Sequence, residues 1–246
     1  MARALFMGFA LVAYAIFFAT FLYLIAFVGN LPWVPLTVDR GPNAPVGTAV
    51  VINLVLIAIF GIQHSVMARQ GFKRFWTRVV PLPAERSVYV LLASAVLILL
   101  FTQWRPIDGT VWQVTQPLAA GLLWALFALG WLIVLTSTFL INHFELFGLQ
   151  QAWFNLRNRA AAAPQFRQPF FYKLVRHPLY SGFFLAFWAT PYMTYGHLLL
   201  ALGMSVYMLI AIVYEERDLV ALFGKDYEDY RAQTGKLTPR LRRPAG

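Results

Sequence analysis

Long runs without a charged residue dominate the chain. The five longest cover residues 4–38, 41–68, 87–104, 109–144 and 178–214, and together they hold 154 of the 246 residues. A helix that crosses a bilayer needs about 20 mainly apolar residues. The pattern therefore predicts an all-α, polytopic membrane protein.

Proline and glycine divide these runs into helices. Four spans are predicted at 4–28, 48–68, 86–104 and 117–141. The last run, 178–214, would be about 55 Å long as one helix, against a hydrocarbon core of about 30 Å. Pro191 and Gly196 bracket a turn inside it, which predicts a helical hairpin with arms at 179–190 and 197–214. The chain is expected to have about five transmembrane helices, the last one as part of this hairpin.

Charged residues are scarce and mostly basic. They make up 12% of the chain, against about 25% in soluble domains, which excludes an ordinary soluble enzyme and a disordered chain. The net charge is +10, and 17 of the 20 Lys and Arg residues fall on one side of the membrane if the hairpin enters and leaves there. The positive-inside rule makes that side cytoplasmic, together with the tail after Tyr214. This distribution predicts a multi-pass membrane protein with a lipid bilayer as its partner and no binding of nucleic acid. The expected location is the bacterial inner membrane.

The sequence predicts no metal site. Cysteine is absent, so the chain has no thiolate ligand, disulfide or cysteine nucleophile. No two histidines are separated by three or four residues, and no HExxH motif is present.

Ionisable residues gather instead at helix ends on the predicted cytoplasmic side. Such residues near membrane depth cost free energy and are functional candidates. The candidates are His64, Arg86, His143 and Glu145 from the first four helices, and Arg176, His177, Tyr180, Glu215 and Glu216 from the two ends of the hairpin. Structural roles are the alternative: an interfacial Glu85–Arg86 pair, a backbone contact of His64, capping by His143 and Glu145, and solvation of Glu215 and Glu216.

Two segments carry more specific patterns. The first is RHPLYSG at 176–182, where Pro178 can begin a helix and Gly182 permits a close backbone approach. The second is EERDL at 215–219, followed by a hydrophobic face that predicts an amphipathic C-terminal helix on the membrane surface. The members of that face are Leu219, Leu222, Phe223, Tyr227 and Tyr230.

The paired segments resemble the signature of the isoprenylcysteine carboxyl methyltransferase and phospholipid methyltransferase superfamily. Its members are integral-membrane enzymes that use S-adenosylmethionine, and the resemblance covers about 168–230. Segments at 63–69, 83–86, 142–149 and 187–191 are similar to the narrower methanethiol S-methyltransferase family, which makes dimethyl sulfide and has NnrU-like membrane proteins among its relatives. The Phe-Phe-Tyr at 170–172 departs from the Gly-Pro-Tyr of the wider superfamily, which disfavours a lipidic acceptor.

The resemblance implies one methyltransferase domain over 1–246, with the acceptor side in 1–145 and the S-adenosylmethionine region in 168–230. Tyr180 and Gly182 would line the cofactor site. Arg176 or His177 would meet the carboxylate of the cofactor, and Glu215 or Glu216 its ammonium group.

A small thiol, methanethiol, is the acceptor that the narrower resemblance implies. A thiol is a weak nucleophile until it loses its proton. Arg86 and His64 are the candidates for stabilising the thiolate, and His143 or Glu145 for taking the proton. The alternatives are methylation of a prenylcysteine or phospholipid, and a non-catalytic NnrU-like accessory protein. The sequence makes no prediction of an oligomeric state.

Overall fold

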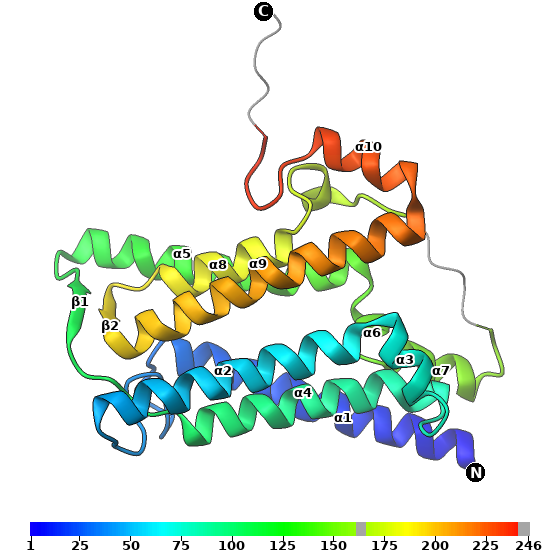
Figure 1. Ribbon diagram of the computed structural model, residues 1–246, viewed down its shortest axis with the longest axis horizontal. Coiled ribbons are helices and arrows are strands. Elements are labelled where there is room, and N and C mark those ends of the chain that lie inside the picture. The colour runs from blue at the N-terminus through cyan, green and yellow to red at the C-terminus, as the bar shows by residue number, and fades with distance from the viewer. Residues whose placement is uncertain (161–165, 241–246) are drawn as a thin grey trace, which may run out of the picture. The chain divides into compact units, whose positions relative to one another are not determined.

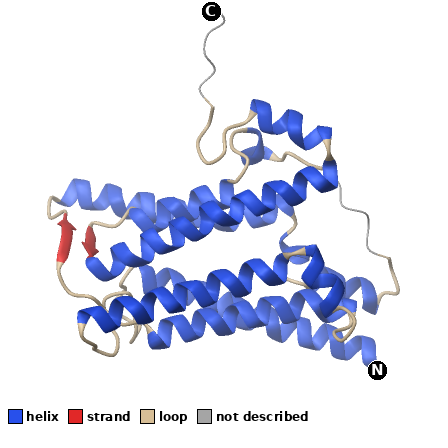
Figure 2. Cartoon of the chain, viewed as in Figure 1, coloured by secondary structure: helices blue, strands red, loops and turns tan. Residues whose placement is uncertain are grey.

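The computed structural model describes residues 1–160 and 166–240, and almost all of its regular structure is helical (Figures 1 and 2). Arg242 and Arg243, which were counted with the basic tail, lie outside the described residues. Within these described ranges, five helices are long and apolar enough to cross a membrane, which confirms the predicted number. They are α1 (Ala2–Val28), α2 (Val46–Ala68), α4 (Leu82–Gln103), α5 (Pro117–Ile141) and α9 (Tyr195–Phe223).

Shorter elements occupy the stretches between these spans. Helix α8 (Pro178–Trp188) is the short first arm of the predicted hairpin. Three helices fall where only loops were predicted, because they are too short to appear in a pattern of apolar runs. They are α3 (Gln70–Trp76), α6 (His143–Leu146) and α7 (Leu149–Leu156), and a single 3-10 turn, η1, covers Phe170–Lys173.

The C-terminal helix differs from the prediction. Instead of one amphipathic helix after Tyr214, α9 continues through Glu215 and Glu216 to Phe223. Gly224 then ends it with a φ of +55°, and a separate helix α10 (Lys225–Gln233) follows. Only glycine adopts this backbone readily, so it breaks the predicted helical face into two parts. Tyr227 and Tyr230 are buried, whereas Leu222 is exposed.

Residues 1–114, 143–160 and 192–204 form the first compact unit. In it α1 packs against α4 and α7, and α2 packs against α4. Strands β1 (Thr110–Gln113) and β2 (Tyr192–Thr194) pair antiparallel. The fully buried Asn53 side chain donates to the Arg105 carbonyl at 2.7 Å and accepts from the Arg105 amide at 2.9 Å, which satisfies a polar group inside an apolar helix.

Residues 115–142, 166–191 and 205–240 belong to the second compact unit. Here α5 and α8 lie side by side (Figure 1). A Cβ atom on Gly182 would stand 2.7 Å from the Gly130 carbonyl oxygen, and one on Gly130 would stand 2.7 Å from the Ala186 amide nitrogen. Small residues allow membrane helices to approach this closely. The structure thus gives Gly182 a packing role, and its predicted place in the cofactor site stays a prediction.

The long helices present apolar side chains outward. In the most apolar 18-residue stretch of α5, only 22% is buried inside the protein. Its exposed side chains include Leu118, Leu122, Leu132 and Phe139. A helix that is apolar all round belongs in a membrane rather than in water. The chain is a multi-pass integral membrane protein.

Candidate active site

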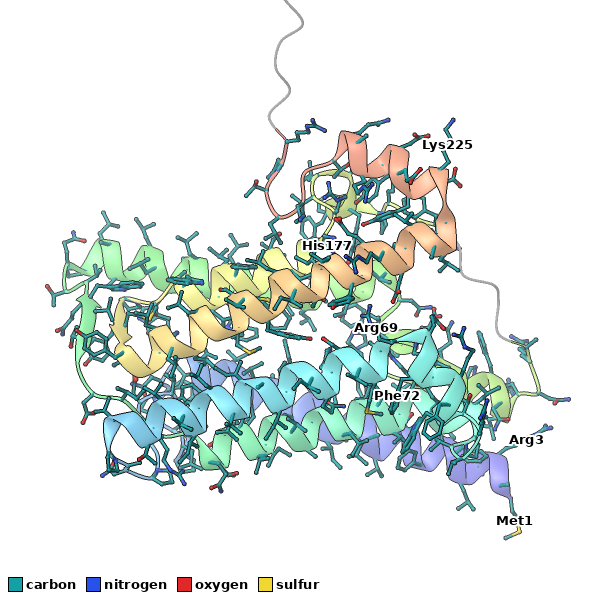
Figure 3. The ribbon with its side chains drawn as sticks, in the orientation of Figure 1. Met1, Arg3, Arg69, Phe72, His177 and Lys225 are labelled. Carbon is teal, nitrogen blue, oxygen red and sulfur yellow. The ribbon has the colours of Figure 1, made fainter. Side chains whose placement is uncertain are left out.

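A buried ion-pair cluster lies at the start of α8 and near the end of α9, in the second unit. Glu216 Oε1 accepts a hydrogen bond from Arg176 Nε at 2.8 Å and lies 3.1 Å from His177 Nε2. The His177 side chain is 3% exposed, and Figure 3 marks it at the start of α8. The structure thus brings together residues about 40 positions apart, as the sequence predicted for the two ends of the hairpin.

Helix geometry gives the two neighbouring glutamates different surroundings. Successive residues of an α-helix point about 100° apart, so Glu215 and Glu216 cannot face the same way. The Glu216 side chain is 12% exposed and the Glu215 side chain 42%. Glu215 Oε2 lies 3.9 Å from His177 Nδ1. Glu215 is therefore the carboxylate that a ligand can reach from solvent.

Arg176 is engaged by the protein on several sides. Its Nε donates to Glu216, and its Nη1 donates to the carbonyls of Arg231, at 3.1 Å, and Thr234. An arginine held in this way fixes the Glu216 carboxylate and lowers the electrostatic cost of burying it.

Tyr180 joins this cluster, and Gly182 does not. The rings of Tyr180 and His177 are 5.8 Å apart, and Tyr180 is partly buried. Gly182 lies against α5, where an added Cβ would be 2.9 Å from the Val134 amide nitrogen. Of the six candidates on the cofactor side, the structure assembles five.

The sequence placed Tyr227 on a hydrophobic face, and the structure buries its hydroxyl as well as its ring. Its side chain is 2% exposed, and its hydroxyl has no hydrogen-bond partner within residues 1–160 and 166–240. Burial, and then the negative charge of Glu216, raises the pKa of Tyr227. A buried hydroxyl without a partner costs free energy, which a polar group of a ligand would recover. In the sequence, the one pattern that could have drawn attention to Tyr227 was its three-residue spacing from Tyr230.

The chemistry of this set fits S-adenosylmethionine. The amino-acid end of the cofactor has an ammonium and a carboxylate group. Glu215 offers an acceptor to the first, while His177 and Tyr227 offer donors to the second.

A groove of about 560 Å³ also opens in the second unit. Tyr230, Thr234 and Lys173 are among its lining residues, and none of the predicted site residues is. Both acidic and basic side chains line it, which include Asp226 and Arg240. It adjoins the candidate site through Thr234, whose carbonyl accepts from Arg176, and through Tyr230, whose ring centroid is 5.8 Å from that of Tyr227.

A second cluster, in the first unit, gathers His64 and Arg86 around Tyr89. The Arg86 guanidinium carbon is 4.6 Å from the centroid of the Tyr89 ring, and the His64 and Tyr89 rings are 5.2 Å apart. Arg86 Nε also donates to the Leu146 carbonyl at 2.6 Å. The sequence predicted that His64 and Arg86 would meet, but it gave no indication of the aromatic ring that both of them contact.

His143 lies in the same unit and is separated from Tyr89 by the ring of Phe147. It is 2% exposed, and its Nε2 is 2.8 Å from the Tyr14 hydroxyl. Its ring centroid is 4.8 Å from that of Phe147, which packs against the core residues Met67, Tyr89 and Val90. Glu145, in contrast, is exposed. Three of the four acceptor-side candidates thus share one buried region.

Gly148 explains how the turn after α6 reaches Arg86. Its φ is +87°, and a Cβ atom there would be 2.5 Å from Ser87 Oγ and 3.2 Å from the carbonyl carbon of Arg86. Only glycine permits this approach. The turn holds the Leu146 carbonyl where Arg86 Nε can donate to it.

Within residues 1–160 and 166–240, no group of three or more His, Asp or Glu side chains could hold a metal ion. The arrangement offers charge, hydrogen bonds and aromatic rings instead.

The chain is similar to several bacterial proteins named methanethiol S-methyltransferase. It is 54% identical over 227 residues to a methanethiol S-methyltransferase of Mycobacterium tuberculosis, which covers 92% of this chain and 93% of that protein. It is 52% identical over 240 residues to methanethiol S-methyltransferase 2 of Bradyrhizobium diazoefficiens, which covers 98% and 92%. A Nurim homolog of Drosophila pseudoobscura is a distant relative, at 29% identity over 69% of this chain and 70% of that protein. No family model and no solved structure matches the chain.

The burial of His143 predicts a pH dependence of stability. Burial lowers its pKa below the ordinary 6.5, so the folded chain binds this proton less readily than the unfolded chain does. The free energy of unfolding is therefore highest, as far as His143 is concerned, above about pH 6.5, and it decreases as the pH falls toward the lowered pKa. His143→Gln, which does not titrate, should lose less stability than the wild type when the pH falls from about 7.5 to about 5. Thermal unfolding in detergent across this range measures the difference, and identical pH profiles would contradict the prediction.

Proposed function

Since the chain belongs to the methanethiol S-methyltransferase family, we propose that it transfers a methyl group from S-adenosylmethionine to methanethiol. The products are dimethyl sulfide and S-adenosylhomocysteine. The observation that supports this best is the buried cluster of Arg176, His177 and Glu216, with Glu215 and the Tyr227 hydroxyl at its edge. The relatives with 51–54% identity are all named for methanethiol, which favours neither a lipidic acceptor nor a non-catalytic role.

On the cofactor side, we assign separate roles to the two glutamates. Glu215 is the more exposed and binds the ammonium group of the cofactor. Glu216 is held by Arg176 and His177 and keeps the imidazole in place. The Tyr227 hydroxyl donates to the carboxylate, and so does His177 Nδ1 when the imidazole carries a proton on both nitrogens, since Nε2 faces Glu216. The Tyr180 ring beside His177 lines the same site.

On the acceptor side, the protein has to make a thiolate. When bound, S-adenosylmethionine supplies an electrophilic methyl group on a positively charged sulfur. The Arg86 guanidinium lies on the face of Tyr89, where it stabilises a nearby anion, and His64 contacts the same ring. His143 lies in the same buried region and is the candidate to receive the thiol proton. Because burial lowers its pKa, it holds this proton weakly and passes it on. Exposed Glu145 is the candidate to pass that proton to water.

We further propose that the site opens to the cytoplasm from the inner membrane of a bacterium. The basic residues support this orientation, because 17 of 20 lie on the predicted cytoplasmic side, in the segments after α2 and α5, in the tail, or at the adjoining ends of α4 and α9.

One experiment tests both the reaction and the orientation. S-adenosylmethionine is charged and does not cross a bilayer, whereas methanethiol does. With both added from outside, inverted inner-membrane vesicles should form dimethyl sulfide, and right-side-out vesicles should form it only after permeabilisation. Product in neither preparation after permeabilisation would overturn the proposed reaction. Product in intact right-side-out vesicles alone would overturn the orientation.

Variants of the cofactor side should weaken donor binding. Loss of a charge-assisted hydrogen bond costs about 1.5–3 kcal/mol, so Glu215→Gln and His177→Ala should each weaken binding of S-adenosylhomocysteine roughly 10- to 100-fold. Isothermal titration calorimetry of the purified protein measures this. Gly121→Ala, whose added Cβ meets no atom within 4 Å, is the control. Wild-type affinity in both variants would refute the assigned roles.

The acceptor side predicts a pH-dependent defect. Arg86→Ala and His64→Ala should fold and bind donor normally but turn over slowly at about pH 7. The defect should shrink toward pH 10, because solution then supplies the thiolate that the site no longer makes. Turnover is measured with methanethiol and normalised to donor-binding sites. A defect that is constant with pH would show that neither residue acts on the thiol.

A further inference from the structure

The segment after α10 makes an unusual series of contacts with the start of α8. Four consecutive carbonyls, those of residues 234–237, accept hydrogen bonds from the RHPLYSG segment. The Thr234 carbonyl accepts from Arg176 Nη1, and the Gly235 carbonyl accepts from the Arg176 amide at 2.8 Å. The Lys236 carbonyl accepts from the His177 amide at 3.1 Å, and the Leu237 carbonyl accepts from Ser181 Oγ at 2.7 Å. We call residues 234–237 the strap.

The conformation of the strap depends on Gly235. A Cβ atom at this position would stand 1.9 Å from the Thr238 carbonyl oxygen and 3.0 Å from the Arg240 amide nitrogen. Both of these are backbone atoms and cannot rotate away. Any other residue at 235 therefore has to open the turn, which would move the carbonyls away from Arg176 and His177.

Both ends of the strap are anchored. Before it, Tyr230 in α10 donates to the Tyr172 carbonyl at 2.5 Å, and burial raises the pKa of Tyr230 to about 12. After it, Arg240 Nη1 donates to the Ala232 carbonyl and closes the turn. At the far end of the contact, Ser181 Oγ also lies 3.1 Å from the His177 carbonyl. The Ser181 hydroxyl can donate to only one of these two carbonyls at a time, and the shorter distance favours the Leu237 carbonyl.

We propose that the strap is a wall of the donor site, and that Gly235 and Ser181 are positioning residues for Arg176 and His177. This inference rests on the proposed function, since it assumes that these two residues serve donor binding. The strap acts through the backbone: it fixes the amides of Arg176 and His177, and with them the direction in which both side chains meet Glu216. It has no proposed contact with the thiol.

The test uses Gly235→Ala, Ser181→Ala and the double variant, with Gly121→Ala as the control. Binding of S-adenosylhomocysteine to the purified full-length protein is measured by calorimetry, and KM is measured for each substrate. Ser181→Ala should weaken donor binding about 3- to 10-fold, the effect of losing one neutral hydrogen bond. Gly235→Ala should weaken it at least as much, because opening the turn displaces several of the carbonyls that Arg176 and His177 donate to. KM for S-adenosylmethionine should rise by the same factor, with KM for methanethiol unchanged. The double variant should lose much less than the product of the single losses, because both changes release the same segment.

The possible failures differ from one another. If the wild type binds no S-adenosylhomocysteine, the proposed function fails and the strap proposal fails with it. If the wild type binds and both single variants bind equally well, only the strap proposal is overturned. A rise of both KM values with a lowered thermal midpoint in Ser181→Ala, which removes only one hydroxyl, would indicate general structural damage and would also overturn it.

Discussion

The carboxylate of Glu216 is the group on which the second unit depends. It sits on a helix long and apolar enough to cross a membrane, and burial of an unpaired charge there would cost several kcal/mol. Arg176 and His177 both meet its Oε1. To reach it, the start of α8 has to lie beside the end of α9, and the chain between these points has to turn back as a hairpin. The pairing of RHP with the glutamates is therefore a folding constraint as well as a candidate binding site.

Two close backbone contacts make this pairing possible. The glycine contact between α5 and α8 sets where α8 lies, and the strap sets the direction in which its first residues point. Between α5 and α8 the backbones approach across two glycines, whereas in the strap a glycine lets the turn close so that its carbonyls reach the start of α8. In a membrane, where apolar burial gives little preference among helix partners, such close packing and hydrogen bonding replace the hydrophobic effect as the source of specificity.

The sequence predicted those features that the membrane or an electrostatic cost imposes. The five spans follow because lipid requires long apolar helices, and the gathering of Arg176, His177 and Glu216 at one membrane face follows from the topology that the basic residues indicate. The ion pair between them was not predicted, because each of these residues was expected to bind the cofactor. The break at Gly224 was missed, because the apolar spacing continues across it and only the backbone angle reveals it. Tyr89 and the strap were missed for a related reason. An aromatic ring between a guanidinium group and an imidazole ring, or a row of carbonyl acceptors, has no distinctive side-chain pattern.

The Arg176–Glu216 ion pair is buried where two apolar side chains could also pack. Replacement of a buried ion pair by well-packed hydrophobic residues is often neutral or stabilising, so stability alone does not explain Arg176 and Glu216. Their geometry suggests another reason. Arg176 donates hydrogen bonds to Glu216 and to the carbonyls of Arg231 and Thr234, so its guanidinium is bound by the protein itself. Glu215, next to Glu216 in the sequence, remains exposed to solvent. The pair thus fixes one glutamate so that the next residue of the same helix, turned by about 100°, is presented to a ligand in a defined position.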